Sequence, residues 1–164
     1  MKYRYAFILY LLAFIVQSSL LQNVSILGVA PNLLLLLTIA LSFLFNERYG
    51  MIFGIIFGLI SDLLFSQVIG VSALSYFLVA LSVSSIKKYL YRDNIFSILF
   101  ISAVGTIFYN ALVWSISSIF GGDIGPLYAL YKQPIAVVYN SLIMLPFYWF
   151  LVRKVIGYRG FKYM

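Results

Sequence analysis

Long apolar runs separated by short polar breaks make up almost the whole chain. A helix needs about 20 consecutive apolar residues to cross the hydrocarbon core of a bilayer. The pattern predicts six membrane-spanning helices, at about residues 5–21, 33–45, 50–65, 71–86, 95–120 and 129–152. The second run is short for a span, and we expect it to form a helical hairpin with the third. We therefore predict an all-α, polytopic membrane bundle of six transmembrane helices that forms a single integral membrane domain over residues 1–164.

The composition fits this pattern. Hydrophobic residues make up 64% of the chain and charged residues 9%, whereas soluble domains carry about 45–50% and about 25%. The first apolar run could instead be a secretory signal peptide, but no good small-residue cleavage site follows it, and it is longer than a signal core of about 7–15 residues. We expect it to be kept as the first transmembrane helix.

The basic residues predict how the chain is oriented. Ten of the eleven Lys and Arg residues lie in the segments 1–4, 46–49, 87–94 and 153–164, and only Lys132 lies in the other links. Positively charged links face the cytoplasm, so both termini are predicted to be cytoplasmic. The basic residues that give the net charge of +7 are then topology signals and contacts to lipid headgroups. We expect no nucleic-acid partner.

Most of the side chains that enzymes use are missing. The chain has no cysteine and no histidine, which removes thiol nucleophiles, disulfides and imidazole chemistry. Its four acidic residues are Glu47, Asp62, Asp93 and Asp123, and no two of them are close in sequence. An enzyme is not excluded by these absences, but most of its usual side chains are missing, and we expect no metal site and no bound cofactor.

The stretch from residue 50 to residue 74 contains the most distinctive pattern. Gly50, Gly54, Gly58 and Asp62 recur every fourth residue and so share one face of the third helix. Small residues at this spacing allow another helix, of this chain or of a partner, to pack closely. An intramembrane carboxylate costs roughly 2.5–3.5 kcal/mol at the bilayer centre, so Asp62 needs donors. The nearest source is the start of the fourth helix, just after Gly70.

We favour a structural role for Asp62, which would tie the third helix to the fourth. A partner or ligand contact in an outer cavity is the alternative, and a proton relay is the least favoured. Three further polar side chains, Gln17, Asn110 and Asn140, are predicted to lie inside spans. Their default role is hydrogen bonding between helices, and a polar pocket shared with Asp62 is the alternative. Pro31 and Asn32 are predicted to start the second helix.

Several motifs in order resemble those of the rod shape-determining protein MreD family. They read QSSL at 17–20, GVAPNLLL at 28–35, GIIFGLISDLL at 54–64 and GVSAL at 70–74, followed by YN at 139–140 and a later proline. One departure is FSQV at 65–68, where the family usually has a turn of small residues and proline. The resemblance covers nearly the whole chain.

The resemblance implies a non-enzymatic protein of the bacterial inner membrane that acts in lateral peptidoglycan synthesis and cell shape. Its implied partners are MreC, the cytoskeletal MreB, the polymerase RodA and a class-B penicillin-binding transpeptidase. The implied fold is similar to the substrate-binding components of energy-coupling-factor vitamin transporters.

Two other functions compete with this one. A substrate-capturing component of a vitamin transporter would have an outward pocket lined by Gln17, Asp62, Asn110 and Asn140. Such components carry an Ala-x-x-x-Ala motif on the first helix, and Ala6 and Ala13 have the wrong spacing for it. A small enzyme of lipid metabolism is disfavoured because catalytic residues are scarce.

Overall fold

The structure is a computed structural model that describes residues 3–21, 28–66, 68–91, 94–120 and 126–152, without the side chains of residues 20, 21 and 126–130. These residues form helices and no strand. The elements are α1 (Tyr3–Val16), the π-helical turn η1 (Gln17–Leu21), α2 (Leu33–Leu44), α3 (Glu47–Phe65), α4 (Val71–Ile86), the 3₁₀ turn η2 (Lys87–Tyr89), α5 (Ile95–Ile119) and α6 (Pro126–Leu151). The all-α prediction is confirmed. Most of the predicted link at 23–30, up to residue 27, and the basic tail at 153–164 lie outside the described residues.

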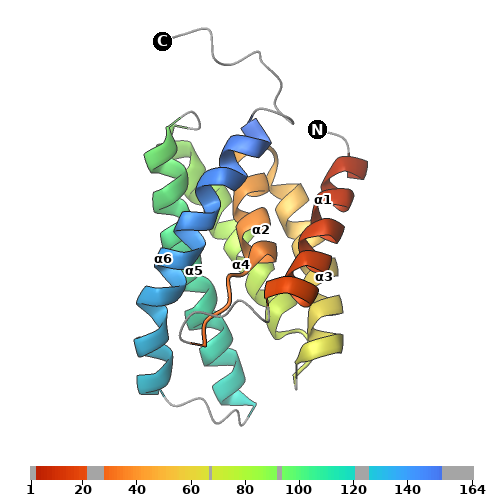
Figure 1. Ribbon diagram of the computed structural model, residues 1–164, viewed down its shortest axis with the longest axis vertical. Coiled ribbons are helices and arrows are strands. Elements are labelled where there is room, and N and C mark those ends of the chain that lie inside the picture. Colours follow the sequence, from red (N-terminus) through yellow and green to blue (C-terminus); the bar gives the residue numbers. More distant parts are fainter. Residues whose placement is uncertain (1–2, 22–27, 67, 92–93, 121–125, 153–164) are drawn as a thin grey trace, which may run out of the picture.

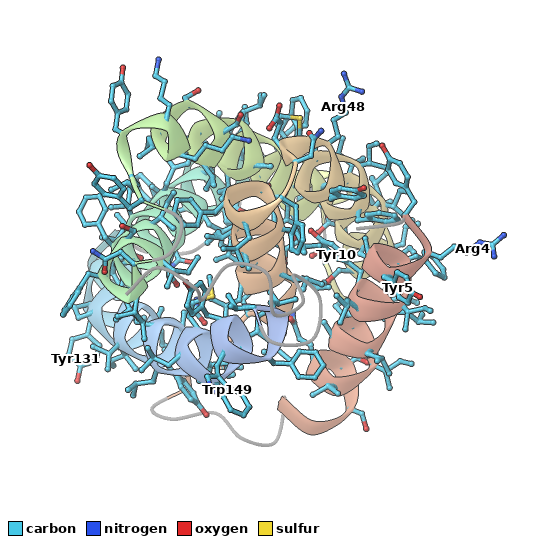
Figure 2. All side chains as sticks on the ribbon, turned by 90° about the horizontal axis from the view of Figure 1, so that it is seen from above. Arg4, Tyr5, Tyr10, Arg48, Tyr131 and Trp149 are labelled. Atoms are coloured by element: carbon cyan, nitrogen blue, oxygen red, sulfur yellow. The ribbon has the colours of Figure 1, made fainter. Side chains whose placement is uncertain are left out.

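Successive helices run in opposite directions, so that α1 begins and α6 ends at the same end of the bundle (Figure 1). Helix α2 lies in the middle and contacts each of the other five α-helices. Seen from above, the others surround it (Figure 2). Every residue from Leu34 to Leu44 is buried. A helix that is apolar on all sides is typical of such a central position, and the sequence of α2, LLLLLTIALSFL, is apolar almost throughout.

Four helical segments are long and apolar enough to cross a membrane. They are Glu47–Phe65, Val71–Tyr89, Ile95–Ile119 and Tyr131–Leu151. Helix α2 has 12 residues and is about 18 Å long at 1.5 Å per residue, which is well below a hydrocarbon thickness of about 30 Å. One end of α2 therefore lies within the bundle. The described chain has six α-helices, as predicted, and four of its helical segments are long enough to cross a membrane. The exact number of membrane spans stays a prediction.

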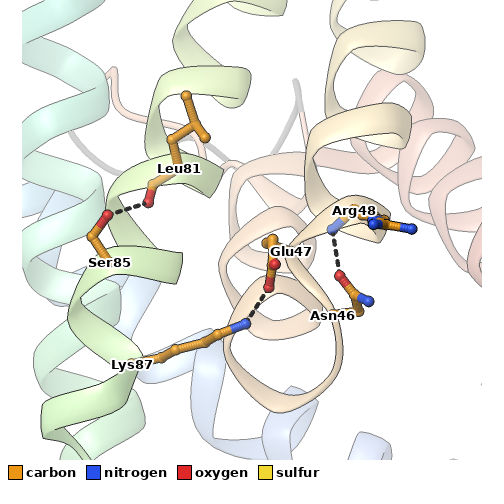
Figure 3. Close-up of polar contacts among 6 residues, drawn as sticks. All are labelled: Asn46, Glu47, Arg48, Leu81, Ser85 and Lys87. Carbon is orange, nitrogen blue, oxygen red and sulfur yellow. Dashed lines mark hydrogen bonds and ion pairs between the residues drawn. The ribbon is translucent and has the colours of Figure 1, made fainter.

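Basic residues gather at one end of the bundle, which we call the basic end. The start of α1 lies beside the start of α3, because the Tyr3 and Tyr49 rings are 4.8 Å apart. Glu47, the first residue of α3, forms an ion pair with Lys87 at the end of α4 (Figure 3). Arg4 and Arg48 point outward at this end (Figure 2).

Candidate functional site

Asp62 is completely buried near the end of α3 and accepts hydrogen bonds from the start of α4. Its Oδ2 atom accepts from the backbone nitrogens of Gly70 and Ser72 at 2.9 Å and of Ala73 at 3.4 Å. Its Oδ1 atom accepts from the Ser66 hydroxyl at 3.2 Å. The first N–H groups of a helix have no partner within that helix and carry partial positive charge. Asp62 supplies both the acceptor and the negative charge that the start of α4 needs.

Gly70 makes this arrangement possible through its backbone conformation. It precedes α4 with φ at +98°, has no side chain to cap the helix, and leaves that function to Asp62. A Cβ atom at Gly70 would meet nothing within 4 Å, so backbone conformation and not space requires the glycine.

The glycine stripe of α3 packs inside the chain. A Cβ atom at Gly58 would lie 2.6 Å from the Cα atom of Ala73 in α4, and one at Gly54 would lie 3.1 Å from the Cβ atom of Tyr76. A Cβ atom at Gly50 would overlap Ser42 of α2. The stripe therefore brings α3 close to α4 and α2.

A second group of polar residues meets at the start of α2, inside the bundle. The backbone nitrogen of Asn32 donates to Oδ1 of Asn140 in α6 at 3.1 Å. The nitrogen of Leu34 donates to Oε1 of Gln17 in η1 at 3.1 Å, and that of Leu35 donates to Oδ1 of Asn32 at 2.9 Å. Three backbone donors at this helix start thus receive acceptors from three separate segments. We call this set of five residues the α2 cap.

Two polar contacts extend the α2 cap to other helices. The Tyr76 hydroxyl of α4 donates to Oδ1 of Asn32 at 3.0 Å, and Nδ2 of Asn140 donates to the Thr106 hydroxyl of α5 at 3.2 Å. The Tyr76 ring also stacks on Tyr109 with 5.0 Å between ring centroids. The start of α2 is therefore connected to α4, α5 and α6.

The buried tyrosines were not predicted from the sequence. Tyr10 bonds the Thr38 hydroxyl at 2.9 Å between α1 and α2, and both residues are fully buried. Tyrosine is common at membrane surfaces, so a buried tyrosine cannot be told from a surface one by its residue type. One signal was available, since Ala6 and Ala13 flank Tyr10 on the same helix face and all three are buried.

Pro31 is not in the first turn of α2, where its residue type led us to expect it. Helix α2 begins at Leu33, and Asn32 is its N-cap residue with φ at −104° and ψ at 90°. Pro31 is the residue before the cap and is buried. The physical reason is that the Asn32 side chain caps the helix, so the helix starts immediately after it.

Asn110 makes no hydrogen bond with the described residues of the α2 cap. Its Nδ2 atom donates to Oε1 of Gln133 in α6 at 2.9 Å, and Gln133 in turn donates to the carbonyl oxygen of Ile107 at 3.1 Å. Asn110 therefore joins α5 to α6 at another place. The structure brings Gln17 and Asn140 together at one helix start and leaves Asp62 and Asn110 at two separate contacts.

Two cavities flank the segment that leads into α2. The α1 cavity, of about 230 Å³, lies beside α1, η1 and α3 and is lined by Phe14, Gln17, Ser18, Ala30, Pro31, Asn32, Ser61 and Phe65. The α6 cavity, of about 330 Å³, lies beside α5 and α6, and its polar and aromatic lining consists of Asn32, Tyr109, Asn110, Trp114, Lys132, Gln133 and Asn140. Asp62 lines neither cavity. Within the described residues, no cluster of acidic side chains could hold a metal ion.

Comparison with known proteins gives one match. The family described as rod shape-determining protein MreD matches residues 2–158. No curated protein and no solved structure matches the chain. The match extends over nearly all of the 164 residues and agrees with the resemblance found in the motifs. The chain therefore belongs to the rod shape-determining protein MreD family.

Proposed function

We propose that this chain is a non-enzymatic membrane scaffold of the bacterial cell-elongation machinery. Membership of the family already gives the chain a role in rod shape determination. The observation that supports a scaffold is that polar side chains inside the bundle bind the chain's own backbone. Asp62, Gln17 and Asn140 accept hydrogen bonds from backbone groups at helix starts. These side chains hold a fixed shape, and the lateral surfaces are left for contacts with other proteins.

The proposed direct partner is MreC, through which the chain would act with RodA, a class-B penicillin-binding transpeptidase and MreB. The chain would lie in the inner membrane as a multi-pass protein, with both termini and the basic end in the cytoplasm. The exposed large apolar residues on α1, α3 and α5 support lateral contacts with lipid and with partner helices. Control of lateral peptidoglycan synthesis would follow from bringing these partners together.

A vitamin-capturing component is not supported. Asp62, which would have been the charged group of its pocket, is buried and bonded to α4. Ala6 and Ala13 of α1 are buried within the chain, so these small residues are not free to dock an energising subunit.

A depletion strain tests the proposal. When the protein is depleted, we expect rod-shaped cells to become round, and we expect the plasmid-borne chain to restore the rod. Depleted cells that keep their rod shape would contradict the proposal.

A further inference from the structure

The α1 cavity contains polar groups that have no partner in the described part of the chain. Gln17 uses its Oε1 atom for Leu34, and no described residue accepts a hydrogen bond from its Nε2 atom. The Ser61 hydroxyl also lines the cavity, and it makes no hydrogen bond with any described residue. Polar groups in a membrane are costly when they lack a partner. Both groups can donate, so the cavity suits a hydrogen-bond acceptor.

The rest of the lining indicates which kind of acceptor fits. Among the described residues, no charged side chain lines this cavity. The rings of Phe14 and Phe65, whose centroids are 6.4 Å apart, form apolar walls beside the two donors. A charged phosphate would find no counter-charge here, whereas a neutral carbonyl with apolar groups attached would match both the donors and the walls.

The position of the cavity along the bundle further indicates which neutral carbonyl group it binds. Helix α3 has 19 residues and is about 28 Å long, close to the hydrocarbon thickness of about 30 Å. It begins at Glu47 in the basic end, so Phe65 lies near the opposite edge of the hydrocarbon core. Lipid ester carbonyls lie at that edge, and Ser61 lies one turn further in.

We propose that the α1 cavity binds the glycerol-ester region of a phospholipid from the leaflet opposite the basic end. One ester carbonyl accepts hydrogen bonds from Gln17 Nε2 and from the Ser61 hydroxyl. The acyl chains continue along the outside of α1 and α3, where Leu12, Leu64 and Phe65 are 54%, 62% and 55% exposed. The lipid thereby packs against the same segment that carries the α2 cap.

A pair of lipids that differ only in the carbonyl tests this directly. The full chain is purified in detergent with equal amounts of diester and diether phosphatidylglycerol that have matched chains, and the retained lipid is measured by native mass spectrometry. We expect about a five-fold preference for the diester lipid, the ratio that one net hydrogen bond provides. Equal retention of the two lipids would overturn the proposal.

Variants in the cavity provide the second comparison. Ser61→Ala removes one donor and should reduce the preference, and Ser61→Leu fills the cavity and should abolish retention of the specific lipid. The matched control is Ser85→Ala, because the exposed Ser85 hydroxyl bonds only to the Leu81 carbonyl of its own helix, near the basic end (Figure 3). If Ser61→Leu keeps as much diester lipid as this control does, the cavity is not the site.

A photo-crosslinker at position 14, which is half-buried and lines the cavity, identifies the occupant in cells. Benzoylphenylalanine in place of Phe14 should become attached to a phospholipid, seen as a mass increase of one lipid on the chain. Attachment to a polypeptide would show that a partner's peptide carbonyl fills the cavity, and the lipid proposal would be wrong.

Discussion

The side chain of Asn140 accepts a hydrogen bond from the backbone nitrogen of Asn32, 108 residues earlier in the chain, at 3.1 Å. The same Asn140 side chain donates to Thr106 of α5 at 3.2 Å. One amide group thus holds α5 and α6 against the start of the central helix. The first N–H groups of a helix have no acceptor within that helix, and the α2 cap supplies acceptors for three backbone N–H groups at this helix start.

Replacing Asn140 by leucine should destabilise the bundle. The variant leaves the Asn32 backbone nitrogen without an acceptor, and a buried unsatisfied group costs about 1–3 kcal/mol. Unfolding in mixed micelles, followed by circular dichroism, measures the difference. The control Leu142→Ala changes a residue of the same helix that is 61% exposed and should have little effect. Equal stability of Asn140→Leu and wild type would show that the α2 cap contributes nothing.

Two substitutions at Asp62 separate the acceptor from the charge. In Asp62→Ala the three backbone donors of α4 lose their acceptor, and we expect a loss of about 3 kcal/mol in the free energy of unfolding. Asp62→Asn keeps an amide oxygen for these donors and loses the charge and the oxygen that accepts from Ser66, so about 1 kcal/mol should be lost. Thermal unfolding of both variants in detergent gives the order. A larger loss for Asp62→Asn than for Asp62→Ala would contradict this account of the site.

Gly58 should tolerate no side chain at all. An added methyl group would lie 2.6 Å from the Cα atom of Ala73, which is backbone and cannot move aside cheaply. We expect Gly58→Ala to cost about 2 kcal/mol and to lower the amount of protein in the membrane. Gly54→Ala is the matched comparison, because its nearest neighbour is a Tyr76 side-chain atom at 3.1 Å, and its loss should be smaller. Similar accumulation of Gly58→Leu and wild type would show that α3 and α4 do not pack closely.

The sequence predicted the helices well because apolar runs and polar breaks set their ends directly. The expected 71–86 helix is observed as Val71–Ile86, and Asp62 was expected to find donors at the start of that helix, where the structure has them. Asp62 lies close in sequence to the start of α4, so the backbone N–H groups of that helix start are the nearest donors that its carboxylate can reach. Local sequence therefore carried enough information for this contact.

Long-range contacts could not be predicted in the same way. Gln17 and Asn140 were identified as polar residues in spans, but their meeting at the start of α2 depends on how α1 and α6 pack around a short central helix. The buried tyrosines show the same limit. Neither Tyr10 nor Tyr76 differs in local pattern from a tyrosine at the membrane surface, and only the tertiary structure gives them Thr38 and Asn32 as partners.

The proposed orientation can be tested by cysteine labelling, because the chain has no cysteine of its own. Lys88→Cys lies at the basic end and should be protected from a membrane-impermeant thiol reagent in whole cells. Ser118→Cys lies near the other end of the bundle, at the end of α5, and should react. Permeabilised cells provide the control, since both positions should then be labelled. Reaction of position 88 from outside would reverse the orientation.

The scaffold is tested most directly by identifying what purifies with the chain from its own membrane. Mass spectrometry of the purified protein measures both protein partners and bound small molecules in one sample. If the chain is this scaffold, MreC should be present in a fixed stoichiometric ratio and no vitamin should be bound. A tightly bound vitamin, together with the absence of MreC, would contradict the scaffold and favour a transport component.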